Sequence, residues 1–144
     1  MIETTMSQLC GFQEGQNPFN DYVGIRDVRI DDEGNYFLVM KVTEIMLNPF
    51  GKIHGAVLFA LCDSAAGSYM DSSNRSSLTL NSSINFYRTA QLGDVLTAQV
   101  HERKMGKTVS VLEVEIVNQR GERVADSSLH MFRKEKEGVA PPKR

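Results

Sequence analysis

The sequence contains no tryptophan, only two cysteines and three histidines, and no marked excess of charge of either sign. The net charge is −2, so there is no excess of basic residues that would bind nucleic acid, and nucleic acid is not expected as a partner. The histidines (His54, His101 and His130) fall on separate expected elements, and Cys10 and Cys62 are far apart. Because no spacing typical of metal ligands occurs, we expect no metal site.

No stretch is both apolar enough and long enough to span a membrane comfortably. The longest apolar run, Gly55–Met70, has roughly 16 residues and is interrupted by Asp63, whereas a spanning helix needs about 20. The first ten residues have neither the cationic start nor the apolar centre of a signal peptide. Since a free thiol at Cys62 also suits a reducing compartment, we expect a cytoplasmic protein without membrane contact.

The run from Gly55 to Met70 is the most informative stretch that is present. Its length favours a helix over a strand, because strands average about 5–6 residues. A helix that is apolar on all sides is expected to be buried on all sides. Burying the unpaired carboxylate of Asp63 would cost several kcal/mol, so Asp63 needs either a compensating hydrogen-bond network with the strand near residues 79–85 or a chemical task.

The remaining sequence predicts six strands joined mostly by short turns, which favours an antiparallel sheet. We expect strands over residues 22–30, 36–43, 78–87, 95–103, 108–118 and 123–133, the last four in a meander. In residues 78–87, Thr79 belongs to a polar face opposite the apolar face that contains Ile84 and Phe86. The domain is predicted over residues 21–133, after an N-terminal arm (1–20) with at most a short helix and before a disordered tail (134–144). Because one sheet can cover only one side of the helix, the far side needs a second copy of the chain.

The pattern Asn48-x-x-Gly51-x-x-His54-Gly55, with Asp63 eight residues after the last glycine, resembles the hotdog-fold acyl-CoA thioesterases. Within them it is most similar to the phenylacetate-degradation type, over residues 22–133. Further matches are the helix residues 58–67, the strand residues 84–90 and the Gly93-Asp94 turn. The resemblance implies an α+β hotdog fold, in which a curved antiparallel sheet wraps around one long central helix. It also implies hydrolysis of an acyl-CoA by a homodimer, with a dimer of dimers expected; coenzyme A is then part of the substrate, and no cofactor is needed.

The motif residues suit the chemistry of thioester hydrolysis. A helix N-terminus presents free N–H groups, and Gly55, lacking a side chain, allows a carbonyl oxygen to approach its N–H closely. Asn48 and His54 can hold the loop and the acyl group, and Asp63 can act as general base or as nucleophile. Each also has a purely structural interpretation: Asn48 as a turn former, His54 as a helix cap and Gly55 as a packing position.

Eight residues of helix separate Gly55 from Asp63 by about 12 Å, so one chain cannot use both on a single carbonyl. Two antiparallel helices would set Gly55 of one chain against Asp63 of the other, which predicts two sites per dimer. The resemblance additionally implies that a hydroxyl on the strand after the helix orients the water, and by alignment on Ile84-Asn85-Phe86 this hydroxyl is that of Thr79.

Phosphates of coenzyme A require cations, and five basic residues near the expected dimer rim are candidates: Arg88, Arg103, Lys104, Lys107 and Arg133. Each could equally be an ordinary solvated charge. Residues that could line the acyl pocket are Met46, Phe50, Leu58, Phe59 and Tyr69. The sequence leaves aryl-acetyl, benzoyl and medium-chain groups open, and two other functions remain alternatives: an enoyl-CoA hydratase or dehydratase of the same fold, and a non-catalytic acyl-CoA-binding regulator.

Overall fold

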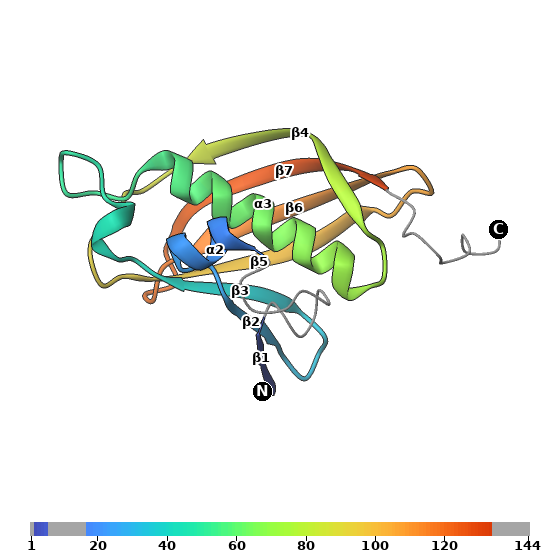
Figure 1. Ribbon diagram of the computed structural model, residues 1–144, viewed down its shortest axis with the longest axis horizontal. Helices are drawn as coiled ribbons and strands as arrows, with labels where there is room; N and C mark the ends of the chain where they lie inside the picture. Colours follow the sequence, from blue (N-terminus) through green and yellow to red (C-terminus); the bar gives the residue numbers. More distant parts are fainter. Residues whose placement is uncertain (1, 6–16, 134–144) are drawn as a thin grey trace.

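The computed structural model describes residues 2–5 and 17–133, and these form one antiparallel sheet of seven strands with a long helix against one face (Figure 1). The elements are β1 (Ile2–Thr5), α2 (Pro18–Val23), β2 (Asp27–Ile30), β3 (Tyr36–Lys41), the 3-10 turn η1 (Glu44–Met46), α3 (Gly55–Ser72), β4 (Ser77–Phe86), β5 (Val95–Lys104), β6 (Val109–Val117) and β7 (Arg123–Arg133). The predicted α+β class, with a curved antiparallel sheet around one long helix, is confirmed.

The core lies between the sheet and α3. Alternate strand residues point toward the helix and are buried, as on β6 with Leu112, Val114 and Ile116. On α3 the side that faces the sheet is buried, including Leu61 and Cys62. Burial of this apolar surface is the main stabilising contribution and holds the helix in place.

The opposite side of α3 is not fully buried in the single chain, although the helix is apolar almost all round. Ala56 is exposed, and Phe59, Ala60 and Asp63 are only half-buried. The expectation of burial on all sides is therefore wrong for one chain alone. The argument that one sheet covers only one side of the helix agrees with this open face. Among the described residues, no helix has the length and apolar character that crossing a membrane requires.

The strand order is β1-β2-β3-β5-β6-β7-β4, so the predicted four-strand meander is wrong for its first member. β4 lies at the edge beyond β7, and β5 pairs with β3 instead. Helix α3 crosses the sheet, so the strand that follows it, β4, lies at the far edge. The connection after Phe86 crosses back, so the next strand, β5, lies beside β3. A turn signal such as that at Gly93 does not distinguish a tight hairpin from such a crossing connection.

Two N-terminal expectations also change. The first part of the strand expected at residues 22–30 is the end of α2, because Asn17 caps that helix, Pro18 starts it and Gly24 ends it with a left-handed φ of 94°. The backbone of β1 extends the sheet beside β2. The expected turn at residues 31–35 is confirmed, and β3 returns beside β2. The predicted disordered tail (134–144) lies outside the described residues.

Candidate active site

The N-terminus of α3 presents a free backbone donor. His54 is the N-cap, and its Nδ1 accepts a hydrogen bond from the N–H of Ala56 at 3.1 Å. The tautomer of a neutral His54 therefore carries its proton on Nε2. No acceptor among the described residues engages the N–H of Gly55. This N–H points out at the positive end of an 18-residue helix and can donate to a ligand oxygen.

Asn48 organises the loop that leads into α3. Its Oδ1 accepts hydrogen bonds from the backbone N–H groups of Phe50 (2.9 Å) and Lys52 (3.1 Å), and its own N–H donates to the Lys52 carbonyl. The left-handed Gly51, with a φ of 71°, completes the turn. The carboxamide oxygen of Asn48 is thus engaged in the loop, and only the amide NH₂ group is left to face a substrate.

Asp63 lies two helical turns after Gly55, on the open face of α3. The hydroxyl of Thr79 donates to its Oδ1 at 2.6 Å, a short charge-assisted hydrogen bond. The structure therefore brings together Asp63 and Thr79, as both the catalytic and the structural interpretation of Asp63 anticipate. One hydroxyl satisfies only part of a carboxylate, and no donor from the described residues engages Oδ2, so this oxygen can accept from a further donor.

A β-bulge explains how Thr79 reaches Asp63. The register of β4 against β7 shifts between Thr79 and Asn81, which leaves Leu80 without a partner. Side chains alternate between the two faces along a regular strand. Because Ser82, Ile84 and Phe86 face α3, Thr79 would point away from α3 if β4 had no bulge. The extra residue puts Thr79 on the same face as these three, so the polar face predicted for Thr79 is wrong.

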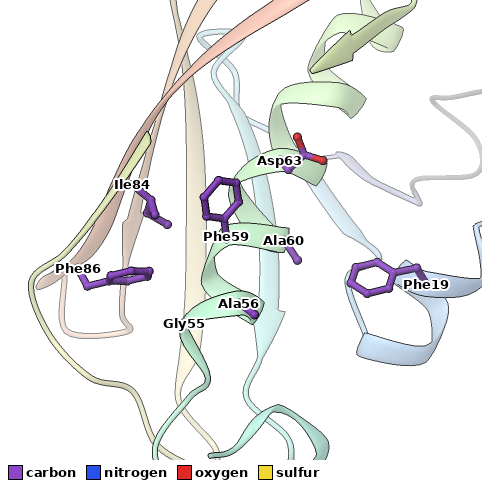
Figure 2. Close-up of a pocket in the computed structure, with 8 residues that line it drawn as sticks. All are labelled: Phe19, Gly55, Ala56, Phe59, Ala60, Asp63, Ile84 and Phe86. Atoms are coloured by element: carbon purple, nitrogen blue, oxygen red, sulfur yellow. The ribbon is translucent and has the colours of Figure 1, made fainter. Parts of the chain in front are cut away.

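Gly55 and Asp63 line opposite ends of one hollow of about 760 Å³ (Figure 2). Its floor is the open face of α3, where Ala56 and Ala60 leave room, and the side chain of Phe59 projects to the side of α3 on which Ile84 and Phe86 lie. The other lining residues are Phe19 from α2 and Ile84 and Phe86 from β4. The expected separation of Gly55 and Asp63 by about 12 Å holds because both are on one continuous helix.

The five residues suggested for the acyl pocket have different surroundings in the single chain. Of its five suggested residues, Phe59 lines the hollow, whereas Met46 and Leu58 are buried in the core. Phe50 is 86% exposed on its loop, and the hydroxyl of Tyr69 donates to Glu102 near the other end of α3. Phe19 was missed, although the cap and proline before it and Gly24 after it signal a short helix.

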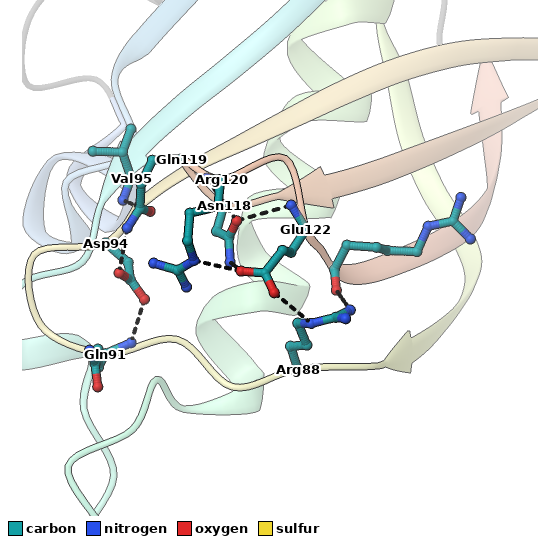
Figure 3. Close-up of polar contacts among 9 residues, drawn as sticks. Arg88, Gln91, Asp94, Val95, Asn118, Gln119, Arg120 and Glu122 are labelled. Atoms are coloured by element: carbon teal, nitrogen blue, oxygen red, sulfur yellow. Dashed lines mark hydrogen bonds and ion pairs between the residues drawn. The ribbon is translucent and has the colours of Figure 1, made fainter.

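The candidate phosphate ligands do not form one cluster. Arg88 pairs with Glu122 at 3.3 Å and donates to the carbonyl of Arg123, within a polar network at the α3 N-terminal end (Figure 3). Arg103 pairs with Glu113 at 2.6 Å. Lys104, Lys107 and Arg133 have no ion pair within the described residues. Arg133 pairs with Ser77 at the start of β4, and its N–H donates to the carbonyl of Thr108, the residue after Lys107.

Asp94 anchors the other side of the network in Figure 3. Its carboxylate accepts from Gln119 Nε2 at 2.8 Å and from the Gln91 N–H at 3.0 Å, joining the turn before β5 to the turn between β6 and β7. These hydrogen bonds, that of Gln119 first, lower the pKa of Asp94 below its ordinary value. Its place in the turn motif is therefore structural. In the part of the chain that the structure describes, no three His, Cys, Asp or Glu side chains gather as a metal site would require.

Comparison with known proteins agrees with this fold. Residues 50–125 match the family model of the thioesterase superfamily. The acyl-coenzyme A thioesterase PaaI of Escherichia coli is 37% identical over 99 residues, which cover 69% of this chain and 71% of PaaI. A solved structure of the E. coli PaaI protein from the phenylacetic acid degradation operon superposes with a TM-score of 0.80 at 32% identity, covering 90% of this chain and 94% of the other. The chain belongs to the thioesterase superfamily, within its hotdog-fold, PaaI-like members.

A hypothetical thioesterase of Streptococcus pneumoniae, solved with coenzyme A, gives a TM-score of 0.70 at 35% identity, covering 74% of this chain and 86% of that one. Further structures of that protein carry single replacements by alanine of an aspartate and of a threonine, at positions 16 residues apart. Asp63 and Thr79 are separated by the same number of residues.

Proposed function

We propose that this chain hydrolyses an acyl-CoA thioester, with an aryl or medium-chain acyl group, to the free acid and coenzyme A in sites shared between two copies. One observation carries the proposal: a free N–H at Gly55 and a hydroxyl-bound carboxylate at Asp63 share one open helix face, too far apart to serve the same carbonyl in one chain. The Asp–Thr spacing in the Streptococcus pneumoniae protein supports the assignment.

The proposed reaction uses each motif residue at a stated atom. The thioester carbonyl oxygen accepts from the Gly55 N–H, which stabilises the negative charge that develops there. Asp63 of a second copy either takes a proton from a water whose oxygen attacks the carbonyl carbon, or attacks the carbonyl carbon itself to form a mixed anhydride that water then hydrolyses to the free acid. The C–S bond breaks, and the thiolate of coenzyme A leaves and is protonated. Thr79 holds one Asp63 oxygen, and Asn48 and His54 shape the loop that fixes Gly55.

Contacts within the chain support one proposed arrangement of two copies. If Gly55 of one copy faces Asp63 of the other, the midpoint of the paired helices, at the twofold axis, is Phe59. On the edge strand, Phe86 lies beside Gly55 and Thr79 beside Asp63. Phe86 and Thr79 pair with Ala125 and Met131 on β7. Ser128, midway between these two residues, pairs with Ser83. The helix and the edge strand therefore support the same proposed axis, with Ser83 opposite Ser83 of the second copy.

Oxidative cross-linking tests this arrangement. In a Cys10→Ser background, Ser83→Cys should form a disulfide-linked dimer, because opposite residues of paired strands lie within reach of a disulfide. Asn85→Cys is the matched control on the same strand; two residues from the axis, it should stay unlinked. Equal cross-linking of both variants, or of neither, would contradict the register.

A dimer of dimers is proposed from a second surface. Leu78, Phe132 and Val109 pair across β4, β7 and β6 on the sheet face away from α3, and are 58%, 40% and 37% exposed. An apolar row of this kind favours a further contact between dimers. We also propose a cytoplasmic location, supported by the buried free thiol of Cys62. Phosphates of coenzyme A are proposed to bind Lys104, Lys107 and Arg133, with Arg88 and Arg103 requiring release from their carboxylate partners.

Thiol release from a panel of acyl-CoA esters tests the function. Wild-type protein should hydrolyse at least one ester, and Asp63→Asn should reduce turnover by orders of magnitude while leaving a folded oligomer, since an asparagine oxygen can still accept from Thr79. Near-normal turnover in Asp63→Asn would refute the assignment. Ester binding without turnover would favour a regulator, and hydration of an enoyl-CoA without thiol release would favour a hydratase.

A further inference from the structure

The short helix α2 forms one wall of the hollow in an unusual way. Phe19 lines the hollow and yet is 60% exposed, so its ring presents an unfilled apolar surface. The next residue, Asn20, is only 6% exposed, and its Oδ1 accepts from the Ser64 hydroxyl at 3.1 Å. Ser64 directly follows Asp63 on α3. This part-buried hydrogen bond links the residue after Phe19 to the residue after the carboxylate.

The opposite wall is also aromatic. Figure 2 shows Phe19 on one side of α3, and Phe59, Ile84 and Phe86 on the other. The floor between the walls consists of small residues, with Ala56 exposed and Ala60 half-buried. Aromatic side chains around a floor of small residues favour a flat group, which can contact a ring in stacked or edge-to-face geometry. A two-carbon acyl group is too small to reach Phe19 and Phe86 together.

We infer that Phe19 is a specificity-determining residue for the acyl group, and that Asn20 and Ser64 are positioning residues that hold α2 so that Phe19 faces the hollow. This inference rests on the proposed thioester hydrolysis. Phe19 packs against a bulky, planar acyl group and contributes little to the hydrolysis of a small one. The hydrogen bond between Asn20 and Ser64 makes this selection depend on the same turn of α3 that carries Asp63.

The test compares kcat/KM for phenylacetyl-CoA and for acetyl-CoA in each variant, with the oligomeric state measured in parallel. Phe19→Ala should lower the ratio of the two values about tenfold, the factor that corresponds to one aromatic contact of typical strength. Asn20→Ala and Ser64→Ala should each shift the ratio in the same direction, and the double variant should shift it no further, because both remove one hydrogen bond. Tyr22→Ala, on the same helix at a residue 76% exposed and outside the hollow, is the control and should keep the ratio.

A ratio in Phe19→Ala within twofold of wild type, or equal losses on both esters accompanied by a change of oligomeric state, would overturn the inference and assign α2 to assembly alone. Absence of thiol release from every ester by the wild-type chain would instead overturn the proposed function, and the inference with it. The two failures are distinguishable because the first is read in active variants.

Discussion

Replacing Gly55 with alanine separates the chemistry of the α3 N-terminus from its folding. A Cβ at this position would lie 3.3 Å from Cζ of Phe86, so the ring must move by a few tenths of an ångström. Phe86 is 53% exposed, and a ring with this freedom can move at small cost. Gly55 is not one of the glycines with a left-handed φ, so alanine fits the backbone there.

The expected result is a loss of activity without a loss of stability. Alanine restricts the unfolded chain and suits a helix, so the free energy of unfolding should stay level or rise by up to about 1 kcal/mol. The new methyl group and the displaced ring occupy the space through which a carbonyl oxygen approaches the N–H. Removing an oxyanion donor costs about 10²–10³ in kcat; because the N–H itself remains, we expect a loss on the order of a hundredfold.

Thiol-release kinetics and urea unfolding measure the two effects on the same preparation. Gly67→Ala is the matched control: it lies on the same helix, an added Cβ meets nothing within 4 Å, and it should raise stability similarly without reducing kcat. A kcat/KM of Gly55→Ala within twofold of wild type would show that this N–H does not hold the carbonyl oxygen. A fall in stability parallel to the fall in activity would assign the glycine to packing instead.

Three further outcomes follow from the contacts. Thr79→Val should lower kcat about tenfold while Thr79→Ser retains it, because only serine keeps the hydrogen bond to the aspartate; equal steady-state rates would exclude a role for the hydroxyl. Burial raises the pKa values of Cys62 and Tyr69 to about 12, so the folded chain keeps protons that the unfolded chain releases. The urea midpoint should therefore fall as the pH rises above about 9. A flat pH profile in wild type, or an equal slope in Cys62→Ala, would show that the Cys62 thiol does not contribute to this pH dependence. Asp94→Ala should lower the free energy of unfolding by about 1–3 kcal/mol at pH 7, measured by thermal unfolding. This difference from wild type should shrink as the pH falls through the lowered pKa of Asp94, because acid protonates the wild-type carboxylate. A difference that stays constant with pH would show that the charge of Asp94 does not contribute.

Local signals in the sequence were sufficient for the main elements and for part of the site. The extent of α3 and the turn at residues 31–35 depend on neighbouring residues, and both were predicted correctly. The separation of Gly55 and Asp63 along one helix follows from helical geometry alone. The cap and glycine that bound α2 were also readable, but the valine and isoleucine residues that follow favoured a strand there.

Nonlocal contacts decided the rest. β4 lies at the sheet edge because the chain, after α3, pairs with β7 and not with β5. The turn residues in the sequence do not determine this pairing. The bulge at Leu80 arises from pairing with β7, and it alone turns Thr79 toward Asp63. Phe19 lines the hollow beside a hydrogen bond between Asn20 and Ser64, which are 44 residues apart.

By itself, the sequence determined that one apolar helix begins at a free glycine N–H and carries a carboxylate two turns later, because periodicity and helix geometry are local properties. Only the tertiary structure decided what surrounds that face: the aromatic walls, the hydroxyl on the carboxylate, and the edge strand left open beside them. These depend on strand order and register, which are set by packing between residues far apart in the chain.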